Sequence, residues 1–116
     1  MGYLEKLKSF IIEWNKDPIE DEWLFPTFLD DVVGPMTPEE AFSNIGITVN
    51  VLIEQSDEST ALAVLQTILR LARQSNTTEI PQELFEAKDV IAVQFQQYDD
   101  YAKKKYDELL HFYRWN

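Results

Sequence analysis

The sequence predicts an all-α protein, because apolar residues recur three or four positions apart along most of the chain. No segment alternates between apolar and polar residues over the length of a strand. The 116 residues suit a single domain, residues 1–116, and a content of 45% hydrophobic residues supplies enough apolar surface for one core. We therefore expect a compact bundle of about five or six helices, ending in a long C-terminal helical region. Stacked helix pairs of solenoid type are an alternative arrangement of the same helices.

The N-terminal third is predicted to hold one regular helix and two short ones. The first helix carries an apolar stripe at helical spacing, made of Tyr3, Leu4, Leu7, Phe10, Ile11 and Trp14. Asp17 is a candidate cap for the next helical turn, because Pro18 follows it at the first helical position. Pro26 is expected to break this stretch into a short turn from Ile19 to Trp23 or Leu24 and a second short helix from Thr27 to about Val33.

Two longer helices are predicted in the middle of the chain. Thr37, Pro38 and Glu40 form a capping-box pattern that starts a helix at residue 38. Gly46 permits close packing in the middle of this helix, and its buried face is expected at Ala41, Phe42, Ile45, Val49, Leu52 and Ile53. The next helix runs from about Glu58 to Gln74, after a cap at Ser56 or Asp57. It is apolar over much of its circumference, which predicts a central position.

The last helical region opens at Pro81 and continues to Trp115. This length is unusual for one helix, so a bend is expected near Lys88–Asp89. Tyr113 and Trp115 are expected to pack on the first helix, while exposed rings in this tail would allow a homodimer contact. The segments 52–57 and 71–76 are similar in sequence, which we interpret as a chance likeness of two helix ends.

The net charge of -11 comes from one part of the chain. Residues 1–16 carry two acids and three bases, and residues 70–116 carry eight acids and seven bases. The stretch between them has no Lys or Arg before Arg70 and contains eleven carboxylates: Asp17, Glu20, Asp21, Glu22, Asp30, Asp31, Glu39, Glu40, Glu54, Asp57 and Glu58. Such a field attracts a cationic partner and repels polyanions, which disfavours direct binding to nucleic acid or to an anionic membrane. Solubility alone is the competing explanation for these acids.

Patterns typical of catalysis or of cofactor binding are not found in the sequence. With no Cys and one His, His111, the chain lacks a thiol nucleophile and thiolate metal ligands. Glu108 and His111 match the Glu-x-x-His step of di-iron bundles, but such a site needs a second step of this kind. Adjacent carboxylates such as Asp30 and Asp31 point about 100° apart on a helix and form no acid–base dyad. We therefore expect no enzyme activity, no cofactor and no metal site.

A protein-binding surface is the expectation that remains. Large apolar residues among carboxylates are typical of interface hot spots. Phe25, Phe28 and Leu29 are expected to fill the core, whereas Trp23 is the better candidate for exposure. The predicted partner-binding residues are Asp17, Glu20, Asp21, Glu22, Trp23, Asp30, Asp31, Glu39, Glu40, Asp57 and Glu58.

A location in the cytoplasm is also expected. Charged residues interrupt the apolar positions of the N-terminus, so it lacks a signal-peptide core. The longest uncharged stretch, residues 41–53, is too short and too polar to cross a bilayer. The absence of Cys fits a reducing compartment.

In size, composition and concentrated negative charge, the chain resembles the immunity proteins of bacterial toxin systems, including contact-dependent and polymorphic toxins. The resemblance covers the whole chain and carries no specific motif. It implies a protein that binds a cognate, basic toxin domain and blocks its functional surface with an acidic face. A helical regulatory adaptor or scaffold that binds a non-toxin partner is the alternative.

Overall fold

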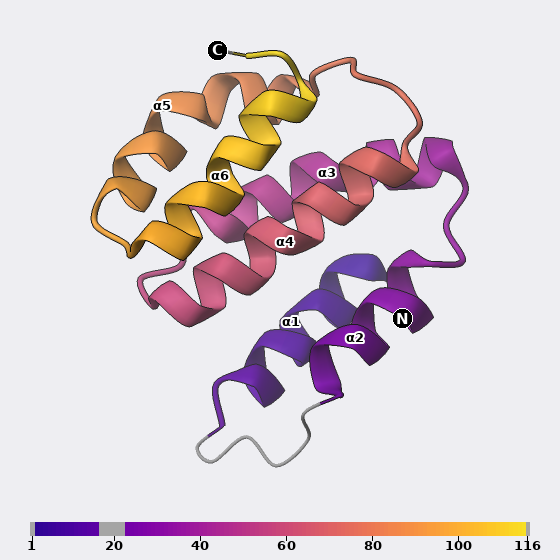
Figure 1. The fold of residues 1–116 in the computed structure, drawn as a ribbon. Coiled ribbons are helices and arrows are strands. Elements are labelled where there is room, and N and C mark those ends of the chain that lie inside the picture. The colour runs from indigo at the N-terminus through magenta and orange to yellow at the C-terminus, as the bar shows by residue number, and fades with distance from the viewer. Residues whose placement is uncertain (1, 17–22, 116) are drawn as a thin grey trace.

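The computed structural model describes residues 2–16 and 23–115, which form six α-helices and one π-helical turn (Figure 1). These described residues contain no strand, so the all-α prediction is confirmed. None of their helices is both long and apolar enough to span a membrane. In chain order the elements are α1 (Tyr3–Trp14), α2 (Leu24–Phe28), η1 (Leu29–Val33), α3 (Pro38–Leu52), α4 (Glu58–Gln74), α5 (Gln82–Gln96) and α6 (Asp100–Phe112).

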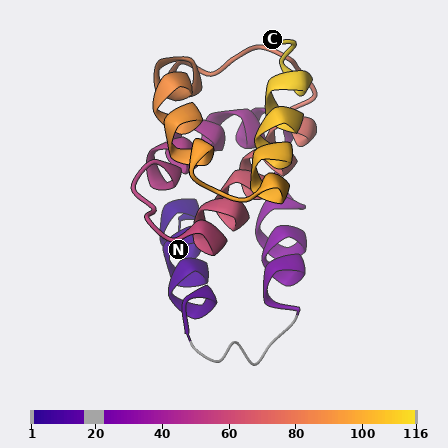
Figure 2. The same ribbon diagram turned by 60° about the vertical axis from the view of Figure 1, so that its left-hand side comes forward.

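The helices form three pairs that stack along the molecule (Figures 1 and 2). The pairs are α1 with α2 and η1, α3 with α4, and α5 with α6. The first helix of each pair contacts the first helix of the next, so α3 lies between α1 and α5. In the same way, α4 contacts both η1 and α6. Hydrogen bonds between neighbouring pairs join residues 38 to 45 positions apart in the chain. The helices of the described residues confirm the predicted bundle of about five or six, and their pairs are stacked in the way that the sequence allowed. The shortest dimension of the molecule, 19 Å, is that of two helix layers.

α4 occupies the centre of the core, as its sequence predicted. Ten of its 17 residues are buried, and α3 packs along one side of it. Two buried threonines have their hydroxyl groups satisfied within their own helices, since Thr67 donates to the Ala63 carbonyl and Thr48 donates to the Asn44 carbonyl. The core is therefore built without an isolated buried polar group on either helix.

The predicted starts of α3 and α4 are confirmed by their caps. The backbone N–H of Glu40 donates to the Thr37 hydroxyl at 3.1 Å, and the Glu40 carboxylate accepts from the backbone N–H of Thr37 at 3.0 Å. At the start of α4, Asp57 accepts from the backbone N–H of Thr60 at 3.0 Å. The predicted buried face of α3 is correct at Ala41, Ile45, Val49 and Leu52. It is wrong near the start, where Phe42 is half-buried, and after the end, where Ile53 is 39% exposed.

Pro26 does not break a helix, contrary to the sequence prediction. α2 begins at Leu24, so Pro26 lies in its first turn, where backbone N–H groups have no acceptor within the helix. The expected helix start at Thr27 is therefore three residues late. η1 continues α2 directly, and the backbone N–H of Gly34 closes it by donating to the Leu29 carbonyl at 2.8 Å. Most of the short turn expected before Leu24 lies outside the described residues.

The bend expected at Lys88–Asp89 is also wrong, because α5 continues through both residues to Gln96. The break lies at Gln97–Asp99 instead. Asp99 caps α6 there and accepts a hydrogen bond from the backbone N–H of Ala102 at 3.0 Å. A capping aspartate therefore sets the boundary that helix length alone located too early.

The C-terminal tail packs on α5, and not on the first helix as expected. The Trp115 ring stacks on Phe85 with ring centroids 6.2 Å apart, and the Lys88 ammonium lies 4.9 Å from the centre of the same ring. Stacking of the pairs explains this correction, because α5 and α6 form the end of the stack opposite α1 (Figure 1). The similar segments 52–57 and 71–76 lie at the ends of α3 and α4, two helices of one pair, so their likeness marks no repeating unit.

Candidate partner-binding surfaces

The predicted partner-binding acids do not form one continuous face among the described residues. Asp17, Glu20, Asp21 and Glu22 lie outside those residues. The remainder fall into two groups at opposite ends of α4, a helix of about 25 Å by its length. Asp57 and Glu58 lie at its N-terminus, while its C-terminal end contacts the segment that carries Asp30, Asp31, Glu39 and Glu40.

Four of the six predicted acids that the structure describes have a structural partner within the protein. Asp30 lies 3.9 Å from Arg70, and Glu40 and Asp57 serve as helix caps. Glu58 accepts from the backbone N–H of Asp99 at 3.3 Å, which ties the start of α4 to the start of α6. Only two of the predicted acids in the described ranges have neither a hydrogen bond nor an ion pair there: Asp31 and Glu39.

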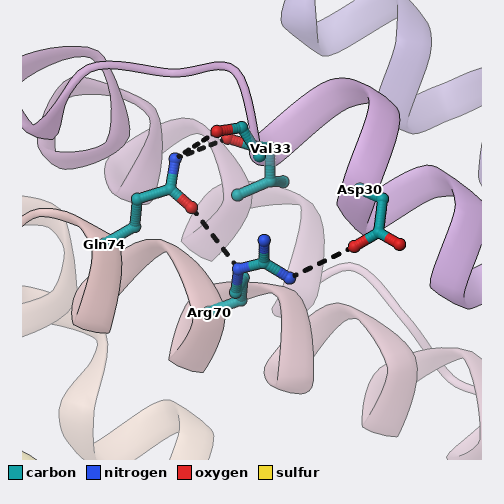
Figure 3. Close-up of polar contacts among 5 residues, drawn as sticks. Asp30, Val33, Arg70 and Gln74 are labelled. Atoms are coloured by element: carbon teal, nitrogen blue, oxygen red, sulfur yellow. Dashed lines mark hydrogen bonds and ion pairs between the residues drawn. The ribbon is translucent and has the colours of Figure 1, made fainter.

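Gln74 at the end of α4 holds the segment after η1 in place (Figure 3). Its amide nitrogen donates to the Val33 carbonyl at 2.6 Å and to the Met36 carbonyl at 2.9 Å, and lies 3.3 Å from the Gly34 carbonyl. Arg70 donates to the Gln74 amide oxygen at 3.4 Å and faces Asp30 from the same helix surface. This network fixes the position of η1 relative to α4, and thereby that of Asp30 and Asp31.

Trp23 is 65% exposed at the start of α2, as predicted for its side chain. Phe28 is buried against Phe10, with ring centroids 4.6 Å apart, and Phe25 is half-buried against the same ring. The aromatic residues of this segment therefore divide between core and surface in the way that the sequence indicated.

A second acidic surface lies along α3 and α5, which run parallel to each other. Two contacts establish the parallel direction. The Glu83 carboxylate near the start of α5 lies over Gly46, and the Gln94 amide near its end donates to the carbonyls of Leu52 and Gln55, both at 3.0 Å. Parallel packing points both N-termini in the same direction, with the acidic first turn of α5 beside the middle of α3. These acids stabilise their helix dipoles individually and form a common negative field together.

The α3–α5 face, as we name this surface, combines carboxylates with exposed apolar side chains. Glu83, Glu86, Val90 and Val93 follow one stripe of α5 at intervals of three and four residues. At the start of the stripe, Glu39 and Glu79 line a hollow of about 400 Å³ together with Phe42. The carboxylates of the face are Glu39, Glu79, Glu83 and Glu86, and its exposed apolar residues are Ile47, Ile53, Val90 and Val93.

No base of α3 or α5 neutralises this face. α3 contains no Lys or Arg, and Lys88, the one base of α5, lies over the Trp115 ring. Within residues 2–16 and 23–115, the ion pairs are Lys16–Glu13, Arg70–Asp30 and Lys105–Glu108, and none involves the α3–α5 face. Its carboxylates are therefore available to an external cation.

The sequence did not reveal the α5 part of this surface, because residues 70–116 are nearly balanced in charge. In the structure Glu79 lines a hollow together with residues of α3, and the Glu83 carboxylate lies over Gly46. Arg73, Lys104 and His111 line a separate hollow of about 460 Å³ between α4 and α6, together with Asp107 and Glu108. The stripe of α5 at helical spacing was the signal that could have indicated a shared face.

The described residues contain no group of three or more His, Cys, Asp or Glu side chains placed to hold a metal ion. The Glu108 carboxylate of the Glu-x-x-His step lies 3.3 Å from the Lys105 ammonium. His111 is exposed on the same helix, near Arg73 and Lys104.

No protein-family model, curated protein or solved structure matches this chain significantly. The functional proposal therefore depends on the charges and contacts described above.

The close approach of Glu83 to Gly46 leads to a stability prediction. A Cβ at position 46 would overlap the Glu83 carboxylate, which is the free end of a flexible, exposed side chain and can move aside. Because Gly in a helix interior costs about 0.5–1 kcal/mol relative to Ala, we expect Gly46→Ala to stabilise the protein by up to about that amount. Urea unfolding of Gly46→Ala, with and without Glu83→Ala, measures this. A loss of stability in Gly46→Ala that Glu83→Ala relieves would mean that the carboxylate is held rigidly against α3.

Proposed function

We propose that this protein binds a basic protein partner and, more specifically, that it neutralises a bacterial toxin by covering the toxin's functional surface. The observation that carries the proposal is the α3–α5 face, where carboxylates without ion pairs lie next to exposed apolar side chains. Interfaces that bind tightly combine such apolar anchors with a complementary charged rim. The likeness to immunity proteins in size, composition and charge supports a toxin as the partner.

Inhibition would require no chemistry from this chain. Its negative field would accelerate the approach of a cationic surface, and the apolar contacts would then slow dissociation. A toxin that grips nucleic acid with Lys and Arg would present those same side chains to the carboxylates, so its substrate would be excluded. The proposal thus describes a cytoplasmic inhibitor that acts by occlusion.

A helical adaptor or scaffold for a non-toxin partner is the second candidate. The observation that favours it is the stacking of helix pairs, since such stacks present extended surfaces used for protein binding. The two candidates differ in consequence, because only an immunity protein restores growth to cells that express the partner. A gene for a large secreted protein beside the gene for this chain would also favour the toxin.

Charge reversal on the α3–α5 face tests the proposal. The test variant carries Glu39→Lys, Glu83→Lys and Glu86→Lys. The matched control carries three charge reversals elsewhere: Glu13→Lys, Asp100→Lys and Asp107→Lys. The partner is first captured from lysate of the source cells at low and at high salt, and its association rate is then measured. We expect the test variant to associate about tenfold more slowly or worse, and the control to keep most of its rate.

Two results would contradict this assignment. If no basic protein is retained at low salt by the unmodified chain, the proposed function is wrong. If a basic partner binds but only Asp31→Lys weakens it, the partner contacts η1, which carries two of the acids predicted from the sequence, and the α3–α5 face is the wrong surface. Circular dichroism confirms that each variant keeps its helices, because Glu39 and Glu83 also favour their helix dipoles.

A further inference from the structure

We infer that the partner places an amphipathic, cationic α-helix along the α3–α5 face, in the seam between the two parallel helices. This inference rests on the proposed function and adds to it the kind of structural element that the surface recognises. The observations behind it are the absence of open backbone groups, the order of acidic and apolar residues along the seam, and the sign of the charge.

A partner can recognise α3 and α5 only through their side chains. Helical N–H and C=O groups are bonded within each helix, so an extended peptide cannot add a strand here. The seam between two packed helices is a groove into which the side-chain ridges of a third helix fit. A helix docked in a groove, anchored by side chains three and four residues apart, is the mode of peptide recognition that suits such a surface.

The residues of the face are ordered along the seam. Glu39, Glu79 and Glu83 lie toward the starts of the two helices, and Glu86 follows one turn later. Val90 and Val93 come next on α5, with exposed fractions of 53% and 64%, and Gln94 beyond them reaches the end of α3, where Ile53 lies. From Glu83 to Val93 the stripe spans about 15 Å, or roughly three helical turns. A matching helix therefore has Lys or Arg toward one end and Leu, Ile or Phe toward the other.

The sign of the charge disfavours contact between this face and the same face of a second copy of this chain. Neither α3 nor α5 offers a free base to pair with the carboxylates of a copy, because Lys88 lies over Trp115. Two such faces would bring like charges together on a protein of net charge -11. A cationic helix from another protein removes that repulsion and also covers the exposed apolar residues.

A pair of synthetic peptides and two matched variants of the full chain test the inference. One peptide has Lys toward one end and Leu at helical period toward the other. The second peptide has the same composition shuffled, so that neither the basic end nor the apolar face forms. Amide resonances of the labelled protein are followed during titration with each. We expect the amphipathic peptide to shift resonances of residues 46–54 and 83–94. We expect Val90→Ser/Val93→Ser to weaken it about tenfold, whereas Ile12→Ser, which removes an exposed apolar residue from α1, has little effect.

Equal binding of the shuffled peptide, shifts centred on α1 and α2, or unchanged affinity in Val90→Ser/Val93→Ser would each overturn the inference. The captured partner separates this failure from failure of the proposed function. A partner that still binds in a salt-sensitive way, is weakened by reversal of Glu39, Glu83 and Glu86, and ignores Val90→Ser/Val93→Ser would leave the function standing and show that no helix lies on the apolar end. The absence of any basic partner would instead reject the function itself.

Discussion

Replacing Phe95 with alanine is expected to lower the free energy of unfolding by about 3–5 kcal/mol, the range for removing a large aromatic ring from a core. Phe95 is 1% exposed. Its ring contacts Tyr98 edge-on with centroids 5.0 Å apart and stacks with Tyr106 at 5.7 Å. The ring therefore joins α5 to α6, and its loss leaves a cavity that the third helix pair cannot close without moving.

The control for this experiment is Phe85→Ala, a change of the same size on the same helix. Phe85 is 60% exposed and contacts Trp115. Its truncation therefore leaves no cavity in the core and should cost about 1 kcal/mol or less. Urea unfolding at equilibrium measures both variants. Similar losses for the two would show that the position of α5 depends on the tail as much as on the core, contrary to the packing described here.

Helix boundaries were predictable wherever a side chain closes the helix end. The Thr37–Glu40 capping box and the Asp57 cap lie where the sequence indicated. The predicted boundaries were wrong where a general rule, such as helix breaking by proline or typical helix length, was overridden by local sequence. Pro26 was expected to break a helix but lies in the first turn of one. The length of the last helical region predicted a bend, but the boundary lies further along the chain, where Asp99 caps α6. The stacking of pairs depends on contacts about forty residues apart, which no local pattern contains.

The acidic character of the candidate surfaces was predictable from the sequence, but which acids share a surface was not. Counting charges along the chain identified an acidic protein, and the position of Trp23 between Glu22 and Leu24 predicted the exposure of its side chain. It did not show that the Glu40, Asp57 and Glu58 carboxylates accept hydrogen bonds from backbone N–H groups at helix starts. Nor did it show that the acids of α5 lie beside α3, since only the parallel packing of these helices brings Glu83 to Gly46. Clustering in sequence and clustering in space are therefore separate properties in this chain.

Raising the pH from about 10 toward 12 is expected to destabilise the folded protein through two tyrosines. Burial raises the pKa of Tyr3 to about 12, although its hydrogen bond to Thr48 partly opposes the effect, and burial raises the pKa of Tyr113 to about 12 as well. In the unfolded chain both ionise near their ordinary value of about 10. Their contribution to stability is therefore complete below that pH and is lost as the pH rises through the folded pKa, at about 1.4 kcal/mol for each unit of difference. Urea unfolding across this range measures the decline.

Two phenylalanine substitutions separate the hydroxyl groups responsible. The Tyr3 and Thr48 hydroxyl groups share a hydrogen bond of 2.7 Å, and Tyr3→Phe should cost about 1 kcal/mol at neutral pH. The buried Tyr113 hydroxyl has no hydrogen-bond partner among the described residues, so Tyr113→Phe should be neutral or slightly stabilising there. Each variant should flatten the alkaline decline, because each removes one group that must stay protonated in the folded state. A decline of unchanged steepness in both variants would assign the alkaline sensitivity to other groups, such as Tyr106, whose pKa is raised by burial and then by Asp89 and Asp107.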